Sequence, residues 1–250
     1  MVNIRDFDVE KVEGDRLDEI FKEQKALMEK YHDIEKATGL LQTDQVPVNI
    51  HDKHGQARLK DFAWRVTEEL GEALEAFEIH SDIEDHYDEE LADALHFLVE
   101  MTILAGIDTQ SLINEVRELQ ENGIEISESE KGLHGGFDKL TLLYVSTALT
   151  DAQVSLFLSG SPEGKRDEDI VVYMTGKFIR ELAKACNFLK NKPWKQSQML
   201  TDVKRFRKQM AKTWQVFIQL AIEANITADR LFELYVGKNK VNKFRQRSNY

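Results

Sequence analysis

The sequence predicts an all-α fold, a compact multi-helix bundle of about seven or eight helices. Apolar residues recur at spacings of three and four along most of the chain, whereas the alternating pattern of strands is nearly absent. Only three prolines interrupt these stripes. The 250 residues, of which 42% are hydrophobic, are enough to bury a large core.

Four apolar stripes in the first half of the chain each predict a helix. They cover residues 17–31, 62–77, 94–105 and 112–119. Four later segments also have helical periodicity, at residues 137–159, 168–190, 199–224 and 228–245. Turn-forming residues separate the helices most clearly at 39–55, 122–136 and 159–167. We therefore expect one all-α domain over residues 1–250, with 123–190 either inside it or as an appended helical lobe.

Composition excludes several classes of protein. No run approaches the roughly 20 apolar residues of a membrane span, and the N-terminal segment is too acidic and polar for a signal or transit peptide. Cys186 is the only cysteine, so no intrachain disulfide can form. A single cysteine agrees with a protein that works in a reducing compartment. We expect a cytoplasmic protein without a membrane partner.

The net charge is unevenly distributed along the chain. A charge of −12 argues against stable nucleic-acid binding. Residues 190–250 nevertheless contain fourteen lysines and arginines against four acidic residues. The two regions could simply have solvated faces of opposite sign. Alternatively, the acidic region binds cations and the basic region binds an anionic ligand such as a polyphosphate.

Two acidic motifs lie on consecutive predicted helices, Glu69-x-x-Glu72 and Glu90-x-x-Asp93. At about 100° per residue, Glu69 and Glu90 fall inside the apolar stripes, and the second acid of each motif borders its stripe. Residues at i and i+3 share a helix face. A short connection at 80–85 makes the helices antiparallel neighbours. The four carboxylates should therefore converge.

Carboxylates on an inward face need a physical reason. Burying one without a partner costs several kcal/mol, so buried acids are normally paired, protonated or bound to a cation. Oxygen ligands suit hard cations, Mg²⁺ above all. The sequence thus predicts a four-helix metal-binding core, while Glu68 and Glu89 point to solvent. The alternative is a set of buried ion pairs with the basic C-terminal region.

The last predicted helix has cations on its inward face. Leu231 and Tyr235 begin a stripe that continues with Lys238, Asn242 and Arg245. These side chains could bind successive phosphates, with Arg245 as a planar fork and Lys238 as a point charge. The alternative is a salt-bridged helix end.

Gln24 is a further polar residue inside an apolar stripe. It lies among Leu17, Phe21, Met28 and Tyr31. A buried amide needs hydrogen-bond partners, so Gln24 could read the edge of a nucleobase. It could equally cap another helix.

These motifs resemble those of a known superfamily. Glu-x-x-Glu, a spacer and Glu-x-x-Asp are similar to the signature of the all-α nucleoside triphosphate pyrophosphatases, which include MazG-like enzymes and dimeric dUTPases. His96-Phe97, three residues after Asp93, resembles the dimeric dUTPase branch. So do the N-terminal Gln24-x-x-Leu27 and a closing motif made of Lys238, Asn242, Arg245, Gln246 and Tyr250.

The resemblance implies a Mg²⁺-dependent enzyme with two or more ions per site. Such enzymes cleave a nucleoside triphosphate, dUTP first of all, between its α and β phosphates to give the monophosphate and pyrophosphate. By motif matching, the metal ligands are Glu69, Glu72, Glu90 and Asp93. The phosphate-binding residues are Lys238, Asn242 and Arg245. A homodimer is also implied, and we hypothesise that Glu69 orients or deprotonates the attacking water.

Two departures from the family pattern concern the base. Met28 replaces an asparagine, and residues 78–82 replace a tryptophan-rich segment. One alternative is therefore a MazG-like pyrophosphohydrolase of other or non-canonical nucleotides. A second alternative is a non-catalytic helical binding module.

Overall fold

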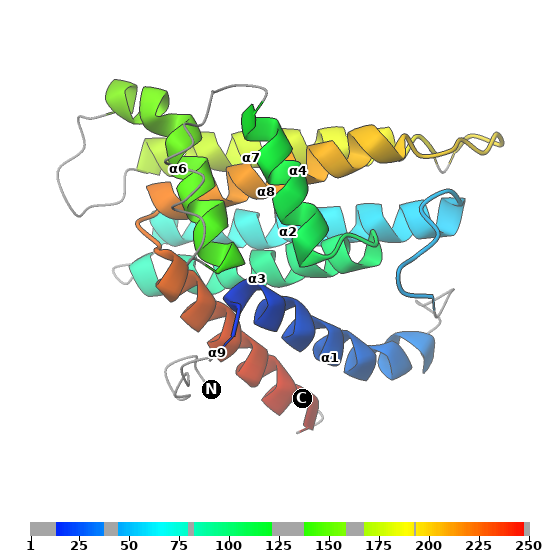
Figure 1. Cartoon of the computed structure of the whole chain (residues 1–250). Helices are drawn as coiled ribbons and strands as arrows, with labels where there is room; N and C mark the ends of the chain where they lie inside the picture. The colour runs from blue at the N-terminus through cyan, green and yellow to red at the C-terminus, as the bar shows by residue number, and fades with distance from the viewer. Residues whose placement is uncertain are drawn as a thin grey trace.

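The computed structural model describes residues 14–37, 45–79, 83–121, 138–158, 168–192 and 194–247 (Figure 1). These residues form eight helices and no strand. The helices are α1 (Arg16–Ala37), α2 (Lys53–Ile79), α3 (Ile83–Leu104), α4 (Thr109–Glu121), α6 (Lys139–Leu158), α7 (Glu168–Phe188), α8 (Val203–Glu223) and α9 (Ala228–Arg247). The predicted all-α fold is confirmed.

The helices form layers around α3. In Figure 1, α2 and α3 run side by side across the middle, α7 and α8 lie above them, and α1 and α9 lie below. The helices α4 and α6 cross the bundle steeply and pack against α8. Because α3 also packs against α1 and α9, it is enclosed from several sides.

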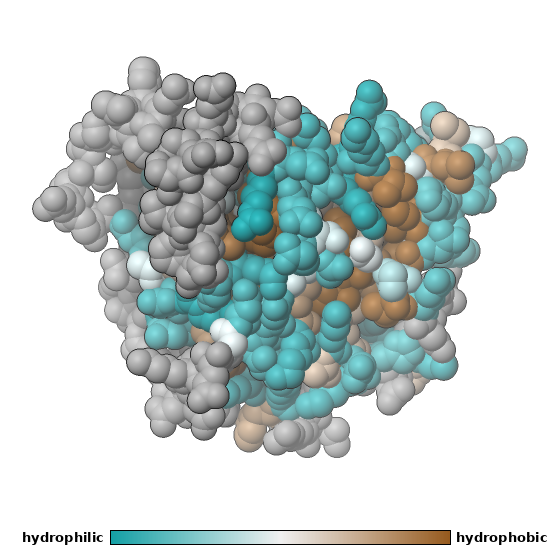
Figure 2. Space-filling view, viewed as in Figure 1, coloured by the Kyte–Doolittle hydropathy of each residue, from teal (hydrophilic) through white to brown (hydrophobic). Residues whose placement is uncertain are grey.

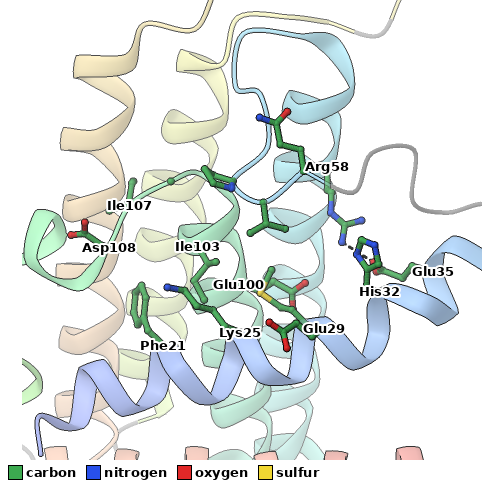
Figure 3. A pocket seen from close by; sticks show the side chains of 15 residues that line it. Phe21, Lys25, Glu29, His32, Glu35, Arg58, Glu100, Ile103, Ile107 and Asp108 are labelled. Carbon is green, nitrogen blue, oxygen red and sulfur yellow. Dashed lines mark hydrogen bonds and ion pairs between the residues drawn. The ribbon is translucent and has the colours of Figure 1, made fainter.

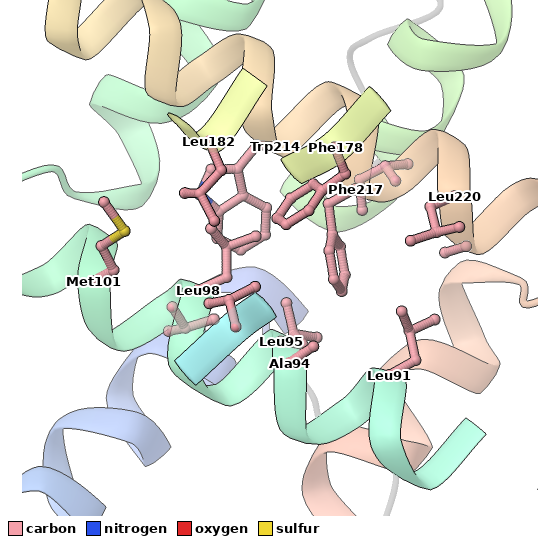
Figure 4. Packing of buried hydrophobic residues seen from close by; sticks show 14 of the residues in the cluster. Leu91, Ala94, Leu95, Leu98, Met101, Phe178, Leu182, Trp214, Phe217 and Leu220 are labelled. Atoms are coloured by element: carbon pink, nitrogen blue, oxygen red, sulfur yellow. The ribbon is translucent and has the colours of Figure 1, made fainter. Parts of the chain in front are cut away.

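Interlocking apolar and aromatic side chains hold α3 against α7 and α8 (Figure 4). Leu98 of α3 is fully buried, as is Trp214 of α8. The Trp214 indole N–H donates to the Thr102 hydroxyl at 2.9 Å, so its polar group is satisfied. Phe178 and Phe217 pack edge to face with centroids 5.6 Å apart. This side of α3 therefore gives the helix a rigid support.

Some helix boundaries differ from those predicted. The helix expected at 199–224 begins at Val203, because the Asp202 carboxylate accepts from the Arg205 N–H and caps it. Leu200 before this cap is exposed. The connection expected at 80–85 is shorter, since α3 already begins at Ile83. Residues 80–82 lie outside the described part.

The predicted lobe contains α6 and α7. Its expected turns at 122–136 and 159–167 lie outside the described residues. Leu143 of α6 and Phe178 of α7 belong to the same hydrophobic cluster as Leu98 of α3. The described parts of this region thus share a core with the rest of the bundle.

The surface in Figure 2 is mostly hydrophilic, with hydrophobic patches in its right half. Large exposed hydrophobic side chains include Trp194, Leu200 and Tyr173. Among the described helices, none combines the length and apolar character that crossing a bilayer requires.

Leu98→Ala tests the core described above. Leu98 is fully buried, so its truncation should lower the free energy of unfolding by about 2–5 kcal/mol. The matched control is Leu200→Ala, because Leu200 keeps 68% of its surface exposed. It should change stability by less than about 0.5 kcal/mol. Urea titration measures both, and equal effects would contradict the arrangement.

Candidate metal and nucleotide site

Three carboxylates converge where α2 and α3 lie side by side. One oxygen from each of Glu69, Glu72 and Glu90 lies within 4.8 Å of the other two. Glu69 lies between the buried residues Val66 and Leu70, and Glu72, about one turn further along α2, is exposed. Donors made only of carboxylate oxygen fit a hard divalent cation such as Mg²⁺.

Asp93, the fourth predicted metal ligand, makes an ion pair instead of joining this group. Its Oδ2 lies 2.6 Å from Nζ of Lys238, which α9 brings across α3. The Lys238 side chain is 8% exposed and that of Asp93 is 19% exposed. A predicted metal ligand, Asp93, is thus in direct contact with a predicted phosphate-binding residue, Lys238. This contact also agrees with the alternative that the acids form buried ion pairs with the basic C-terminal region.

Burial and crowding of like charges shift the acidity of this cluster. Burial raises the pKa of Glu69 to about 8, and neighbouring carboxylates, Asp93 first, raise it as well. Burial also raises the pKa of Asp93 to about 6, although Lys238 opposes this shift. Burial alone would lower the pKa of Lys238, but Asp93 and Glu90 raise it above its usual value. A cation entering the cluster would therefore displace protons.

The other predicted phosphate-binding residues follow Lys238 along α9. Leu231 and Tyr235 are fully buried, as the predicted stripe requires, and Asn242 is half-buried. Arg245 is exposed, and its charge lowers the pKa of Asp93. The stripe therefore passes from the core to the surface near the acidic cluster. The Gln246 side chain and Tyr250 lie outside the described residues.

Gln24 connects three helices. Its side chain is buried, and its Nε2 donates to Oε2 of Glu100 on α3 at 2.9 Å. Its Oε1 accepts from the Tyr235 hydroxyl of α9 at 2.8 Å. In this arrangement Gln24 caps no helix, and its amide is already engaged by protein groups.

Arg58, Phe62 and Arg65 form a row that precedes the acidic residues along α2, and the sequence analysis missed it. Arg65 lies one turn from Glu69, with its guanidinium 4.7 Å from the Phe62 ring centroid and 5.7 Å from that of Phe97. Arg58 lies over the other side of the row, 5.3 Å from the Phe62 centroid. These contacts have cation–π geometry. The sequence signal for this row is the spacing of four and three residues between Arg58, Phe62 and Arg65, which places them on one face of a helix.

His96 is buried on α3 between the acidic cluster and Gln24's partner Glu100. Neither of its ring nitrogens has a hydrogen-bond partner among the described residues. Its ring packs edge-on against Tyr235, with centroids 4.1 Å apart. Burial lowers the pKa of His96 to about 3, so the ring is neutral. Unsatisfied buried nitrogens are costly and are typical of functional sites.

Beyond this row lies a cavity of about 730 Å³ (Figure 3). Its walls come from α1, α2, the C-terminal half of α3 and the segments at 45–47 and 106–108. In Figure 3, α1 passes beneath α3 and α2, which carry Glu100 and Arg58. Arg58 pairs with Glu35 of α1 at 2.7 Å and so links two walls.

A family model described as dUTPase matches residues 16–250, which include all the helices and site residues described above. The chain belongs to the all-α dUTPase family. No curated protein and no solved structure matches it. Membership makes this dUTPase-family chain an enzyme, a nucleoside triphosphate pyrophosphatase. The second alternative, a non-catalytic binding module, is therefore set aside.

Glu69→Gln tests the electrostatics of this dUTPase-family site without Mg²⁺. Glu69 has a pKa of about 8 in the folded chain against 4.5 ordinarily, so the folded state holds its proton over this window. Stability from this group is complete below about pH 4.5 and is lost as pH rises through about 8. Wild type should therefore lose thermal stability relative to Glu69→Gln across this range.

Thermal unfolding in EDTA measures this difference, and Glu68→Gln on the solvent side is the control. Mg²⁺ should stabilise wild type more at about pH 8 than at about pH 6, because fewer protons must then be displaced. Parallel pH profiles for wild type and Glu69→Gln would contradict the assignment.

Proposed function

We propose that this protein hydrolyses a (deoxy)nucleoside triphosphate between its α and β phosphates, giving the monophosphate and pyrophosphate, with Mg²⁺ as cofactor. The observation that carries the proposal is the meeting of Glu69, Glu72 and Glu90 within 4.8 Å beside the Asp93–Lys238 pair. Carboxylates that can bind a cation therefore lie beside Lys238, whose positive charge can bind a phosphate. The chain that carries them belongs to the dUTPase family.

The metal ligands in this proposal are Glu69, Glu72, Glu90 and Asp93, which would hold two or more ions. When bound, Mg²⁺ neutralises phosphate charge and makes water more acidic. A cation bound to Asp93 would compete with Lys238 for that carboxylate. Lys238 would then have hydrogen-bond donors available for a phosphate oxygen.

Glu69 is the residue that we assign to the attacking water. It is half-buried among the acids, so it can lie against both the cluster and a water above it. Its raised pKa makes it a stronger base than an ordinary carboxylate once it is ionised. Asn242 and Arg245 would orient the phosphates from α9.

The family description makes dUTP the reference substrate. The alternative is the same reaction on a nucleotide with another base, because Met28 and residues 78–82 depart from the family pattern in regions associated with the base. The sequence-based expectations of a homodimer and a cytoplasmic location are also part of the proposal.

Glu69→Gln tests the assignment of the catalytic base. The amide keeps the shape of the side chain but cannot accept a proton, so turnover should fall at least about a hundredfold. Pyrophosphate release from dUTP and other triphosphates with Mg²⁺ measures it. The matched control is Glu68→Gln, which removes a charge one residue away.

Glu68 is exposed and accepts from the Trp64 indole on the solvent side of α2. Its replacement should leave turnover within about twofold, since its side chain is exposed on the opposite side of the helix from the buried stripe. Unchanged turnover in Glu69→Gln would refute its role. Release that persists in EDTA would refute the metal requirement.

A further inference from the structure

The described helices contain one structural unit twice. Helices α2, α3 and α4 form the first unit, and α7, α8 and α9 form the second (Figure 1). In the first unit α2 packs against α3, and in the second α7 packs against α8. The third helix of each unit packs on the other unit, α9 on α3 and α4 on α8. The same set of contacts therefore holds when the two units are exchanged.

The turns that end α3 and α8 have the same backbone conformation. Gly106 and Asn225 both have a positive φ, 71° and 59°. The next residues, Ile107 and Ile226, each donate their N–H to the carbonyl five residues earlier, at 3.1 and 2.8 Å. These features define a Schellman motif at both helix ends. Both pairs of residues are separated by 119 positions, which aligns α3 with α8 residue by residue.

Helices α2 and α7 align in a similar way, at a separation of 112 residues. Leu70 and Leu182 are buried, and the residue before each of them is a glutamate on the inner side, Glu69 or Glu181. A buried alanine follows three residues after the leucine in both helices. Glu181 is therefore the counterpart of Glu69.

The other acids of the proposed metal site are not repeated in the second unit. Their counterparts are two lysines and an amide: Lys184 for Glu72, Gln209 for Glu90 and Lys212 for Asp93. The phosphate-binding lysine is not repeated either, because the counterpart of Lys238 is Leu119, a partly buried residue of α4.

The lysine that replaces Glu72 lies directly on the remaining carboxylate. Nζ of Lys184 is 2.9 Å from Oε1 and 3.2 Å from Oε2 of Glu181. Nε2 of Gln209 donates to the same Oε2 at 2.9 Å, and Nε of Arg180 donates to Oε1 at 3.0 Å. The Glu181 side chain is 8% exposed and that of Lys184 is 52% exposed, so the ammonium reaches a buried carboxylate from the surface.

Equivalent glutamates consequently have opposite shifts in acidity. Burial and neighbouring carboxylates raise the pKa of Glu69 to about 8. Burial would also raise the pKa of Glu181, but hydrogen bonds from Lys184, Gln209 and Arg180 hold it below its ordinary value. The protein itself thus supplies the positive charge that the first unit lacks at its acidic cluster.

Resting on the metal site proposed above, we propose that α7 and α8 form a closed divalent-cation site, in which the Lys184 ammonium takes the place of the metal ion. A cation that belongs to the protein neutralises Glu181 permanently, so each chain binds metal in only one of its two units. Replacing the ammonium and its neighbours with oxygen ligands should open the second site to a hard cation.

Lys184→Glu, Gln209→Glu and Lys212→Asp, combined in one variant, restore the acids of the first unit. The parent carries Glu69→Gln and Glu90→Gln, so that the first unit contributes no ion. Electron paramagnetic resonance counts bound Mn²⁺, which accepts the same oxygen ligands as Mg²⁺. The combined variant should bind about one Mn²⁺ or more per chain, whereas the parent should bind none at the same concentration.

The matched control places the same change of charge at exposed positions of the second unit. It combines Gln196→Glu, Lys204→Glu and Lys208→Glu in the same parent. This control should gain no bound ion, because its carboxylates do not converge on Glu181. Equal binding by the control, or no binding by a combined variant that keeps its helical circular dichroism, would overturn the proposal.

Lys184→Glu alone in that parent provides a test if the combined variant does not fold. Removing the ammonium leaves like charges together, so the melting temperature in EDTA should fall. Saturating Mn²⁺ should raise it by about 5 °C or more. Lys204→Glu is the control, and an equal response to Mn²⁺ in both variants would refute the closed site.

The same measurements separate this inference from the proposed function. If wild type binds no Mn²⁺, the metal site at Glu69 fails, yet a gain of binding in the second unit would still support a site closed by Lys184. If the parent keeps a bound ion that Glu181→Gln removes, the second unit is already open and the inference fails, whatever the first unit binds.

Discussion

The structure depends on the cost of placing carboxylates on the inner faces of two adjacent helices. Glu69, Glu72 and Glu90 repel one another where α2 meets α3, and burial adds to that cost. Lys238 compensates for one neighbouring acid, Asp93, and must itself be buried to do so. This pair joins α9 to α3, beside the buried Leu231 and Tyr235 of α9. The remaining acids either repel one another or hold a proton, as Glu69 does below about pH 8, and a divalent cation would replace that proton and neutralise their charge.

Helix α3 lies between the candidate site and the apolar layer that supports it. One side of α3 packs against α7 and α8 through Leu98 and Trp214, and the indole N–H of Trp214 donates to the Thr102 hydroxyl of α3. The other side presents Asp93, His96 and Glu100 at positions i, i+3 and i+7, toward α1 and α9. A rigid apolar layer beneath a polar row holds the side chains of that row at fixed separations. Such support is what a preorganised binding site requires.

Much of this arrangement could be predicted from helix phase, and the exceptions have physical reasons. Glu69 and Glu90 were assigned inward because they share a face with buried apolar residues, and the structure brings both together with Glu72. Glu100 was missed, although it also interrupts the stripe of α3, because its partner Gln24 is 76 residues away in sequence. The start of α8 was placed too early because apolar Met199 and Leu200 extend its pattern, whereas both are exposed ahead of the cap.

The sequence by itself determined the helices, the inward phase of the acids and the family, because periodicity and motif spacing are local properties of the chain. Only the tertiary structure decided which of these side chains meet. Asp93 faces Lys238 and Gln24 faces Glu100 because α1, α3 and α9 pack together, and such contacts depend on packing between segments far apart in sequence. The cavity at Glu100 has the same origin, since its walls come from three helices and two connecting segments.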